Sequence, residues 1–174
     1  MIHLDNIFEY AIIMVSIDTD IIFERRNNHM YNCRIETMDE VSAFIQNLNY
    51  AIDSGAKIVF QRDRIVDVNR PSRFTNAYTV GKLFPNEDPQ SALKRELKKL
   101  TVENYVRTVK DTHFKNRSEF REFGKEYDGE DVYVKIRVEV FGTLGSPQTY
   151  VMSFHFAERK FREEEFPYRN QAGA

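Results

Sequence analysis

Residues 131–157 alternate apolar and polar side chains with a period of two, in two runs separated by a Gly/Pro segment at 142–147. Successive side chains of a β-strand point to opposite faces, so this period predicts two strands, 131–141 and 148–157, each with one packed and one polar face. The first run places Val132, Val134, Ile136, Val138 and Val140 on one face and Tyr133, Lys135, Arg137 and Glu139 on the other.

The second run extends both faces. Its period places Tyr150, Met152, Phe154 and Phe156 on the packed side and Val151, Ser153 and His155 opposite. We therefore expect a phenol, two cations and an imidazole on one surface of the sheet. An imidazole has a reference pKa of about 6.5, so His155 can exchange a proton near neutrality. A strand histidine bonded to a neighbouring side chain is the ordinary alternative.

Helix signals precede this sheet. Thr37-Met-Asp-Glu40 is a capping-box pattern followed by apolar residues at helical spacing, which predicts a helix over 38–53 that ends at Ser54-Gly55. Asp88-Pro89 predicts the start of a second, basic helix. Residues 101–107 resemble a short helical turn.

Shorter patterns complete the outline. Residues 56–61 and 64–68 alternate as short strands do, and 69–89, with three of the five prolines, is expected to be an ordered loop. Residues 120–127 predict another strand, joined by a turn at Asp128-Gly129 to the strand that follows.

The expected fold class is α+β, with a C-terminal three-stranded antiparallel meander packed against helices. We divide the chain into an N-terminal extension at 1–36, an α+β domain at 37–166 and a tail at 167–174. The extension contains a hairpin signal at 21–35 and, before it, a segment that fits a helix or a strand equally well.

Composition and length limit the number of domains and the expected location of the protein. A chain of 174 residues that is 41% hydrophobic is long enough for one domain with a core. Its one cysteine, Cys33, rules out an internal disulfide framework and favours a cytoplasmic location. The longest apolar run, Ala11–Ile17, falls far short of the roughly 20 residues of a membrane span, so we expect no membrane association.

The charge is unevenly distributed. The net charge is −2, yet the segment Lys94–Lys125 holds ten basic and five acidic residues. Such a segment either forms a positive patch that attracts phosphate groups or is a solvated helix face. It contains Arg107, Lys110, Lys115, Arg117 and Arg121.

Motifs of the common cofactor enzymes do not occur. The four histidines have no cysteine or carboxylate at the spacing of a zinc site, and no glycine-rich phosphate loop, nucleophile elbow or dinucleotide fingerprint is present. We therefore expect neither a metal nor a cofactor.

Three segments resemble the MqsR type of toxin–antitoxin ribonuclease, within the RelE-like group of messenger-RNA interferases. These are Leu100-Thr-Val-Glu-Asn-Tyr-Val-Arg107, Val132-Tyr-Val-Lys-Ile136 and Met152-Ser-Phe-His-Phe156. The second is similar to the V-Y-x-K-I strand of that family and the third to its terminal V-S-F-K strand. The resemblance extends over roughly residues 38–160.

The resemblance implies roles for single residues. Arg107 and His155 stand where the family has lysines, and Tyr133 stands where it has a catalytic tyrosine. For the family's glutamine before the central hairpin, only Arg121 or Glu122 lies nearby, and charge favours Arg121. The family's fold is RelE-like, and a cognate antitoxin protein is the implied partner.

The leading hypothesis is a metal-independent endoribonuclease that cleaves single-stranded RNA by attack of the ribose 2′-hydroxyl on the phosphate. His155, Tyr133, Arg107 and Arg121 are the expected catalytic residues. The residues expected to bind RNA are Lys135, Arg137, Lys110, Lys115 and Arg117. The alternative is a non-catalytic module that binds RNA or a protein through the same sheet surface.

Overall fold

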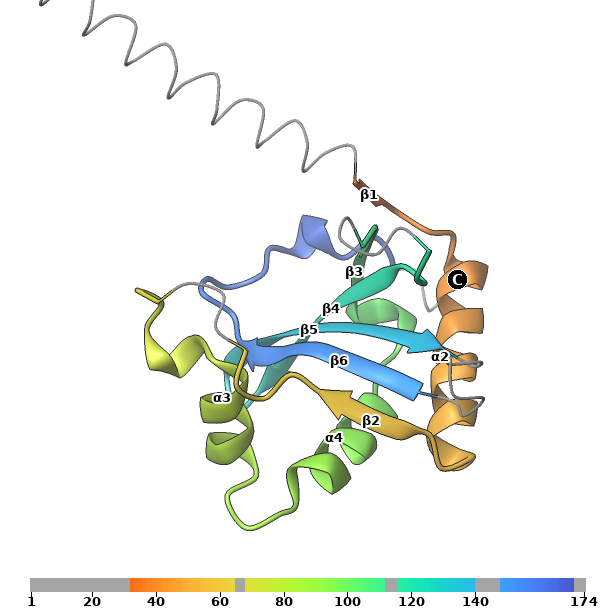
Figure 1. The fold of residues 1–174 in the computed structure, drawn as a ribbon. Coiled ribbons are helices and arrows are strands. Elements are labelled where there is room, and N and C mark those ends of the chain that lie inside the picture. The colour runs from red at the N-terminus through yellow and green to blue at the C-terminus, as the bar shows by residue number, and fades with distance from the viewer. Residues whose placement is uncertain (1–31, 65–67, 112–115, 140–147, 171–174) are drawn as a thin grey trace, which may run out of the picture. The chain divides into compact units, whose positions relative to one another are not determined.

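The computed structural model describes residues 32–64, 68–111, 116–139 and 148–170 (Figure 1). The chain divides into two units, Met1–Cys33 and Arg34–Ala174. Residues 34–36, which the sequence assigned to the extension, belong to that second unit. The hairpin predicted at 21–35 and the segment before it lie largely outside the described residues.

The described elements are three α-helices, six strands and three short 3₁₀-helices, an α+β fold. The helices are α2 (Met38–Asp53), α3 (Asn76–Leu83) and α4 (Pro89–Leu97). The strands are β1 (Cys33–Arg34), β2 (Lys57–Phe60), β3 (Tyr105–Val109), β4 (Phe120–Tyr127), β5 (Glu130–Glu139) and β6 (Gln148–Phe156). The 3₁₀-helices are η1 (Ser72–Phe74), η2 (Val102–Asn104) and η3 (Glu163–Glu165).

The strands form one mixed sheet in the order β1-β3-β4-β5-β6-β2. The predicted meander is confirmed, because β4, β5 and β6 pair antiparallel in sequence. Asp128 and Gly129 have positive φ values of 51° and 82°, which suit the tight turn predicted between β4 and β5. The sheet is not purely antiparallel, since β2 pairs in parallel with β6, with Lys57 opposite Gln148.

A β-bulge in β6 corrects the face assignment of its first half. Lys135 faces Ser153, but the next residue, Ile136, faces Val151, so Met152 is the extra residue. Val151 therefore turns into the core, where it is fully buried, and Tyr150 faces Arg137 on the other side. Strict alternation had predicted the reverse for both residues.

The predicted helices at 38–53 and after Asp88 are confirmed. The Thr37 hydroxyl accepts from the Glu40 backbone N–H, and the Glu40 carboxylate accepts from the Thr37 backbone N–H, so the first turn of α2 is capped. The Asp88 carboxylate accepts from the Ser91 N–H at the start of α4. Apolar positions of α2 and α4 then pack on the sheet.

Two local predictions were wrong. The segment predicted as a loop at 69–89 contains η1 and α3, whose N-cap Thr75 accepts from the Tyr78 backbone N–H. The predicted turn at 101–107 is helical only as far as η2, and Arg107 lies in β3. Most of the strand predicted at 64–68 lies outside the described residues.

A buried amide explains where α3 sits. Asn76 donates to the backbone carbonyls of Gln61 and Met152 and accepts from the Phe154 N–H at 3.0 Å. The side chain thus satisfies polar groups where β2 ends and β6 bulges, and it attaches the start of α3 to the sheet.

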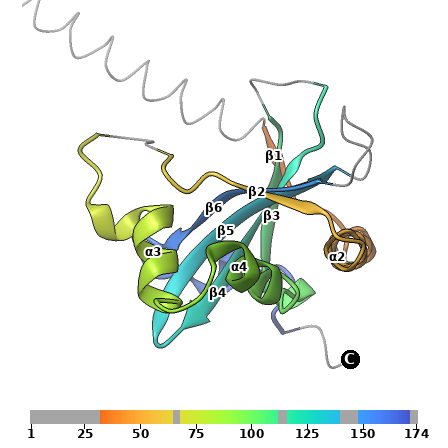
Figure 2. The ribbon, with the colours of Figure 1, turned by 60° about the horizontal axis from the view of Figure 1, so that its bottom comes forward.

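The helices cover one face of the sheet (Figure 2). Residues of α2, α3 and α4 share one core cluster with Val132, Val134 and Phe154 of the central strands. The side chains between these, Tyr133 and Lys135, point to the opposite face. Among the described residues, no helix has both the length and the apolar character needed to cross a membrane.

Candidate functional site

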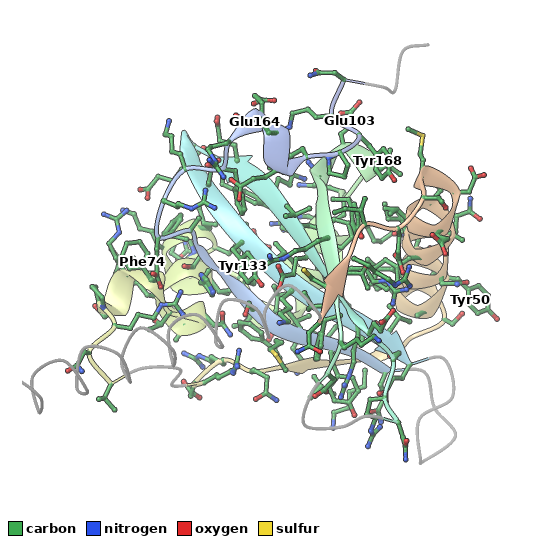
Figure 3. All side chains as sticks on the ribbon, turned by 90° about the horizontal axis from the view of Figure 1, so that it is seen from above. Tyr50, Phe74, Glu103, Tyr133, Glu164 and Tyr168 are labelled. Atoms are coloured by element: carbon green, nitrogen blue, oxygen red, sulfur yellow. The ribbon has the colours of Figure 1, made fainter. Side chains whose placement is uncertain are left out.

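A cavity of about 880 Å³ lies on the face of the sheet opposite the helices. Strands β3 to β6 form its floor, with Tyr133 and His155 among the lining side chains. The connection between β2 and α3 forms one wall, and the segment after β6 forms another. Figure 3 looks onto this face, with Tyr133 over the strands and Phe74 at the neighbouring η1.

Tyr133 and His155 are direct cross-strand neighbours. They face each other in the register of β5 and β6, and their ring centroids are 5.3 Å apart with 33° between the planes. Cross-strand pairs of this kind hold each other's rotamers by contact. The phenol and the imidazole that alternation predicted on one surface therefore meet in one cavity.

His155 is held as a neutral ring. The residue is 8% exposed, and burial, the largest cause, lowers its pKa from the ordinary value. The Phe156 carbonyl oxygen lies 2.9 Å from Nδ1 and favours the charged form, but does not outweigh burial together with the nearby Arg70 and Arg64 charges. At neutral pH the ring has an unprotonated nitrogen.

Glu122 of β4 organises the floor beside Tyr133. Its carboxylate accepts from Arg107 Nε at 2.7 Å and lies 3.4 Å from Lys135 Nζ. Burial opposes its ionisation, but the hydrogen bond with Tyr133 and the two cations prevail and lower the Glu122 pKa. Glu122 is therefore a carboxylate that fixes three side chains of the floor.

Burial and, after it, the same carboxylate keep Tyr133 protonated. Burial and then the Glu122 charge raise the Tyr133 pKa well above its ordinary value. The phenol is consequently a hydrogen-bond donor over the whole physiological range. Its position suits contact with a bound anion better than removal of a proton.

Positive charge exceeds negative charge around the cavity. Five cationic side chains and three carboxylates line it. The cations are Arg64, Arg70, Arg107, Lys135 and Arg159, and the carboxylates are Glu122, Glu158 and Glu165. Arg159 is neutralised by Glu165 at 2.5 and 2.7 Å, whereas Arg64 is exposed at the rim. The excess of cations favours an anionic ligand.

The wall after β6 is fixed to the sheet at a glycine. Phe161 and Phe166 lie against Gly124 of β4 so closely that a Cβ there would come within 2.8 Å of both rings. The Phe161 backbone N–H also donates to the Asp131 carboxylate at 2.8 Å. The segment that positions Glu158 and Arg159 is therefore packed against the sheet and hydrogen-bonded to it.

Four of the predicted site residues come together. Tyr133, His155, Arg107 and Lys135 all line the cavity, although they come from three different strands. Arg107 reaches it from β3 because it faces Glu122 in the register of β3 and β4.

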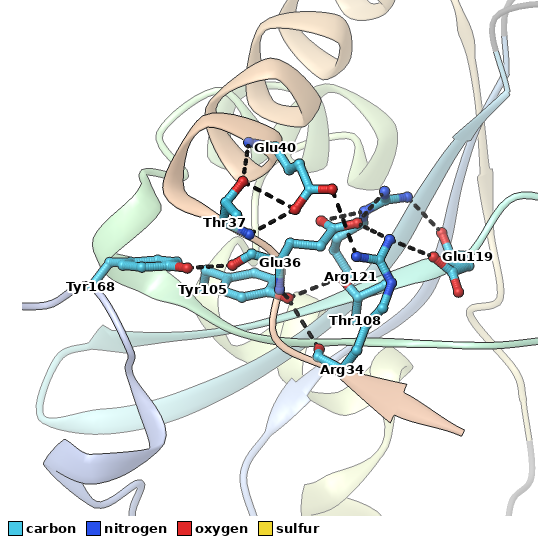
Figure 4. Close-up of polar contacts among 9 residues, drawn as sticks. All are labelled: Arg34, Glu36, Thr37, Glu40, Tyr105, Thr108, Glu119, Arg121 and Tyr168. Atoms are coloured by element: carbon cyan, nitrogen blue, oxygen red, sulfur yellow. Dashed lines mark hydrogen bonds and ion pairs between the residues drawn. The ribbon is translucent and has the colours of Figure 1, made fainter. Parts of the chain in front are cut away.

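Arg121 does not share the cavity. Alternation along β4 directs it to the helix side, where it pairs with the buried Glu36 at 2.7 Å (Figure 4). Its guanidinium carbon also lies 4.6 Å from the centroid of the Phe44 ring. Between the two residues that the sequence offered for this position, the structure places Glu122 in the cavity and Arg121 outside it.

The remaining predicted cations are also apart from the cavity. Arg137 is 6% exposed, lies between the rings of Phe120 and Tyr150, and pairs with Asp111 at 2.7 Å in a separate hollow. Arg117 lines that hollow and pairs with Glu139. Lys110 follows the end of β3 and is exposed, and Lys115 lies outside the described residues.

Sequence reasoning missed the residues of both walls. Arg64 and Arg70 belong to the segment after β2, and Glu158 and Arg159 follow β6. No local motif marks them, since their shared position depends on tertiary contacts. Glu122 did carry a signal, because alternation along 120–127 places it on one face with Tyr133 of the neighbouring strand.

Within the described ranges, no group of three or more His, Cys, Asp or Glu side chains is arranged to hold a metal ion. Comparison of the chain with protein-family models, with curated proteins and with solved structures gave no match.

Proposed function

We propose that this protein is a metal-independent endoribonuclease that cleaves single-stranded RNA, with a kinship to the RelE-like, MqsR-type toxins. The observation that carries the proposal is the pair of Tyr133 and His155, with ring centroids 5.3 Å apart, on the floor of a cation-rich cavity. An aromatic and cationic hollow suits the base stacking and phosphate contacts of a single strand.

The chemistry follows from the protonation states. Neutral His155 takes the proton of the ribose 2′-hydroxyl, and the 2′-oxygen attacks the adjacent phosphorus. The P–O bond to the 5′-oxygen of the next nucleotide breaks, and that oxygen receives a proton from the imidazolium. The products are a 2′,3′-cyclic phosphate and a free 5′-hydroxyl.

Other side chains stabilise the phosphate in this scheme. The guanidinium of Arg107 and the ammonium of Lys135, both in contact with Glu122, donate to the phosphate oxygens as negative charge develops there. Protonated Tyr133 turns its hydroxyl from Glu122 to the same group, donates to it and orients it. No step requires a cofactor.

Partners follow from the proposed activity. RNA is the substrate, and a nuclease of this kind needs restraint inside the cell, so a cognate antitoxin protein that covers the cavity is the second partner. We place this function in the cytoplasm. Expression of the gene alone and together with an adjacent small reading frame tests the antitoxin directly.

A binding module without catalysis is the second candidate. Two observations favour it: His155 is only 8% exposed, and the Tyr133 hydroxyl is hydrogen-bonded to Glu122. In that case the same cavity holds a phosphate group but transfers no proton.

Incubation with RNA in EDTA separates the two candidates. Wild type, His155→Ala and Tyr133→Phe are compared with Tyr150→Phe, a matched control in the separate hollow. If the protein is a nuclease, wild type and the Tyr150→Phe control cleave the RNA, and His155→Ala does not. If wild type binds RNA and leaves it as intact as His155→Ala does, the binding module is the correct function.

A further inference from the structure

Arg70 connects a wall of the cavity to the imidazole on its floor. It lies between β2 and α3, two residues before η1, and its side chain is 16% exposed. Its Nε lies 2.8 Å from Glu158 Oε1, and its Nη2 lies 3.5 Å from His155 Nε2. The three side chains come from segments on both sides of the cavity.

This contact fits only one form of the imidazole. A guanidinium only donates hydrogen bonds and keeps its proton at every physiological pH. The Phe156 carbonyl oxygen, 2.9 Å from Nδ1, can only accept a hydrogen bond, so it needs a donor on that nitrogen. Nδ1 therefore bears the hydrogen, and Nε2 accepts from Arg70 through its lone pair.

The charges around His155 favour the same form. The groups that face it are Tyr133 from β5, Arg64 and Arg70 from the connection after β2, and Glu158 after β6. Burial and the two arginine charges lower the His155 pKa, and the Phe156 carbonyl and Glu158 oppose them. Arg70 is the cation whose contact with the ring is direct.

We propose that Arg70 is a positioning residue that holds the His155 ring with its Nε2 lone pair directed into the cavity and turns a donor to a phosphate oxygen when a phosphate group enters. The positioning of the ring, the first half of the proposal, stands on the geometry alone. The contact with a phosphate, the second half, rests on the proposed function. Glu158 Oε1 forms an ion pair with the guanidinium at its Nε edge, 2.8 Å away, and the Nη donors are left for the ligand. A phosphate beside Arg70 also reduces the repulsion that a protonated ring meets.

Titration of the His155 ring nitrogens by NMR tests the first half in the full chain. Arg70→Gln is compared with wild type and with Arg73→Gln, a control on the same segment whose side chain pairs with Glu130 and stands over Phe74 instead. Arg70→Gln raises the His155 pKa toward its ordinary value, Arg70→Lys restores the lowered value, and Arg73→Gln leaves it unchanged. Unchanged titration in Arg70→Gln overturns the proposal.

Inorganic phosphate is the probe for the second half. Its binding raises the His155 pKa in wild type, and Arg70→Gln weakens its affinity by about tenfold or more, the loss expected for one charge-assisted hydrogen bond. Arg73→Gln keeps the wild-type affinity. If Arg70→Gln binds phosphate as wild type does, Arg70 has no role toward the ligand.

The two proposals fail in different ways. RNA left intact by wild type, together with a shifted His155 titration in Arg70→Gln, removes the nuclease and keeps the positioning role. RNA cleavage with an unshifted titration removes the positioning role alone. If Arg70→Gln does not fold, Glu158→Gln takes its place: loss of that carboxylate lowers the His155 pKa further, and an unchanged value overturns the proposal.

Discussion

Arg107 Nε lies 2.7 Å from Glu122 Oε2, and this pair joins β3 to β4 on the floor of the cavity. Glu122 also contacts Tyr133 and Lys135, so one buried carboxylate sets the positions of a phenol and two cations. The cavity therefore has a fixed set of donors before any ligand arrives, which lowers the cost of binding.

Glu122→Gln tests this arrangement. Loss of the carboxylate charge removes a negative charge from the floor, and this outweighs the looser positioning of the donors, so phosphate affinity rises while the free energy of unfolding falls by about 1–3 kcal/mol. Phosphate titration by calorimetry and denaturant unfolding measure the two effects. Equal stability and equal affinity in the variant would mean that Glu122 does not organise the floor.

Stability depends on pH through His155. Its pKa is lowered in the folded state, so between that value and the ordinary one of about 6.5 the unfolded chain binds a proton that the folded chain does not. The free energy of unfolding therefore decreases as the pH falls below about 6.5. Thermal unfolding across this range should show a weaker pH dependence for His155→Asn than for wild type, and parallel curves would contradict the assignment.

Gly124→Ala should displace the wall after β6. The new Cβ meets Phe161 and Phe166 at 2.8 Å, so overpacking costs about 1–3 kcal/mol of stability and moves the segment that carries Glu158. Gly81→Ala is the control: a Cβ there meets nothing within 4 Å, and alanine favours helix α3 by about 1 kcal/mol. If Gly124→Ala is as stable as Gly81→Ala, the two rings do not hold the wall.

Arg107 and Arg121 should separate activity from stability. Arg107→Met removes a donor to the phosphate and lowers the cleavage rate by about 10²-fold. Arg121→Met leaves the cleavage rate of the folded protein unchanged but lowers the free energy of unfolding by about 1–3 kcal/mol, because the buried Glu36 loses one of its partners. Similar rate losses in both variants would place Arg121 at the site after all.

Local signals were sufficient for α2, α4, β4 and β5, but not for α3 or β3. The capping box of α2, the Asp-Pro start of α4 and the alternation of β4 and β5 each depend on neighbouring residues, and each appears in the structure. Helix α3 was not predicted, because its eight residues lie between prolines and begin with Asn76. The side chain of Asn76 bonds to the end of β2 and to β6. The bulge at Met152 left no mark in the alternation.

The residues of the candidate site were likewise predicted only in part. Alternation alone predicted that Tyr133 and His155 share a face, and the register of β5 and β6 makes them neighbours. Charge alone favoured Arg121 over Glu122, although strand parity directs Arg121 to the helices. Arg70 and Glu158 meet only because the connection between β2 and α3 and the segment after β6 fold over the same face of the sheet, which no spacing in the sequence expresses.

The most direct test uses DNA oligonucleotides that each contain a single ribonucleotide, incubated with the protein in EDTA and analysed by mass spectrometry. A 2′-hydroxyl is the nucleophile in this account, so wild type should cleave only on the 3′ side of the ribonucleotide and leave a 2′,3′-cyclic phosphate, and His155→Ala should leave the strand intact. Cleavage at deoxyribonucleotides, or cutting by His155→Ala at the wild-type rate, would contradict the account.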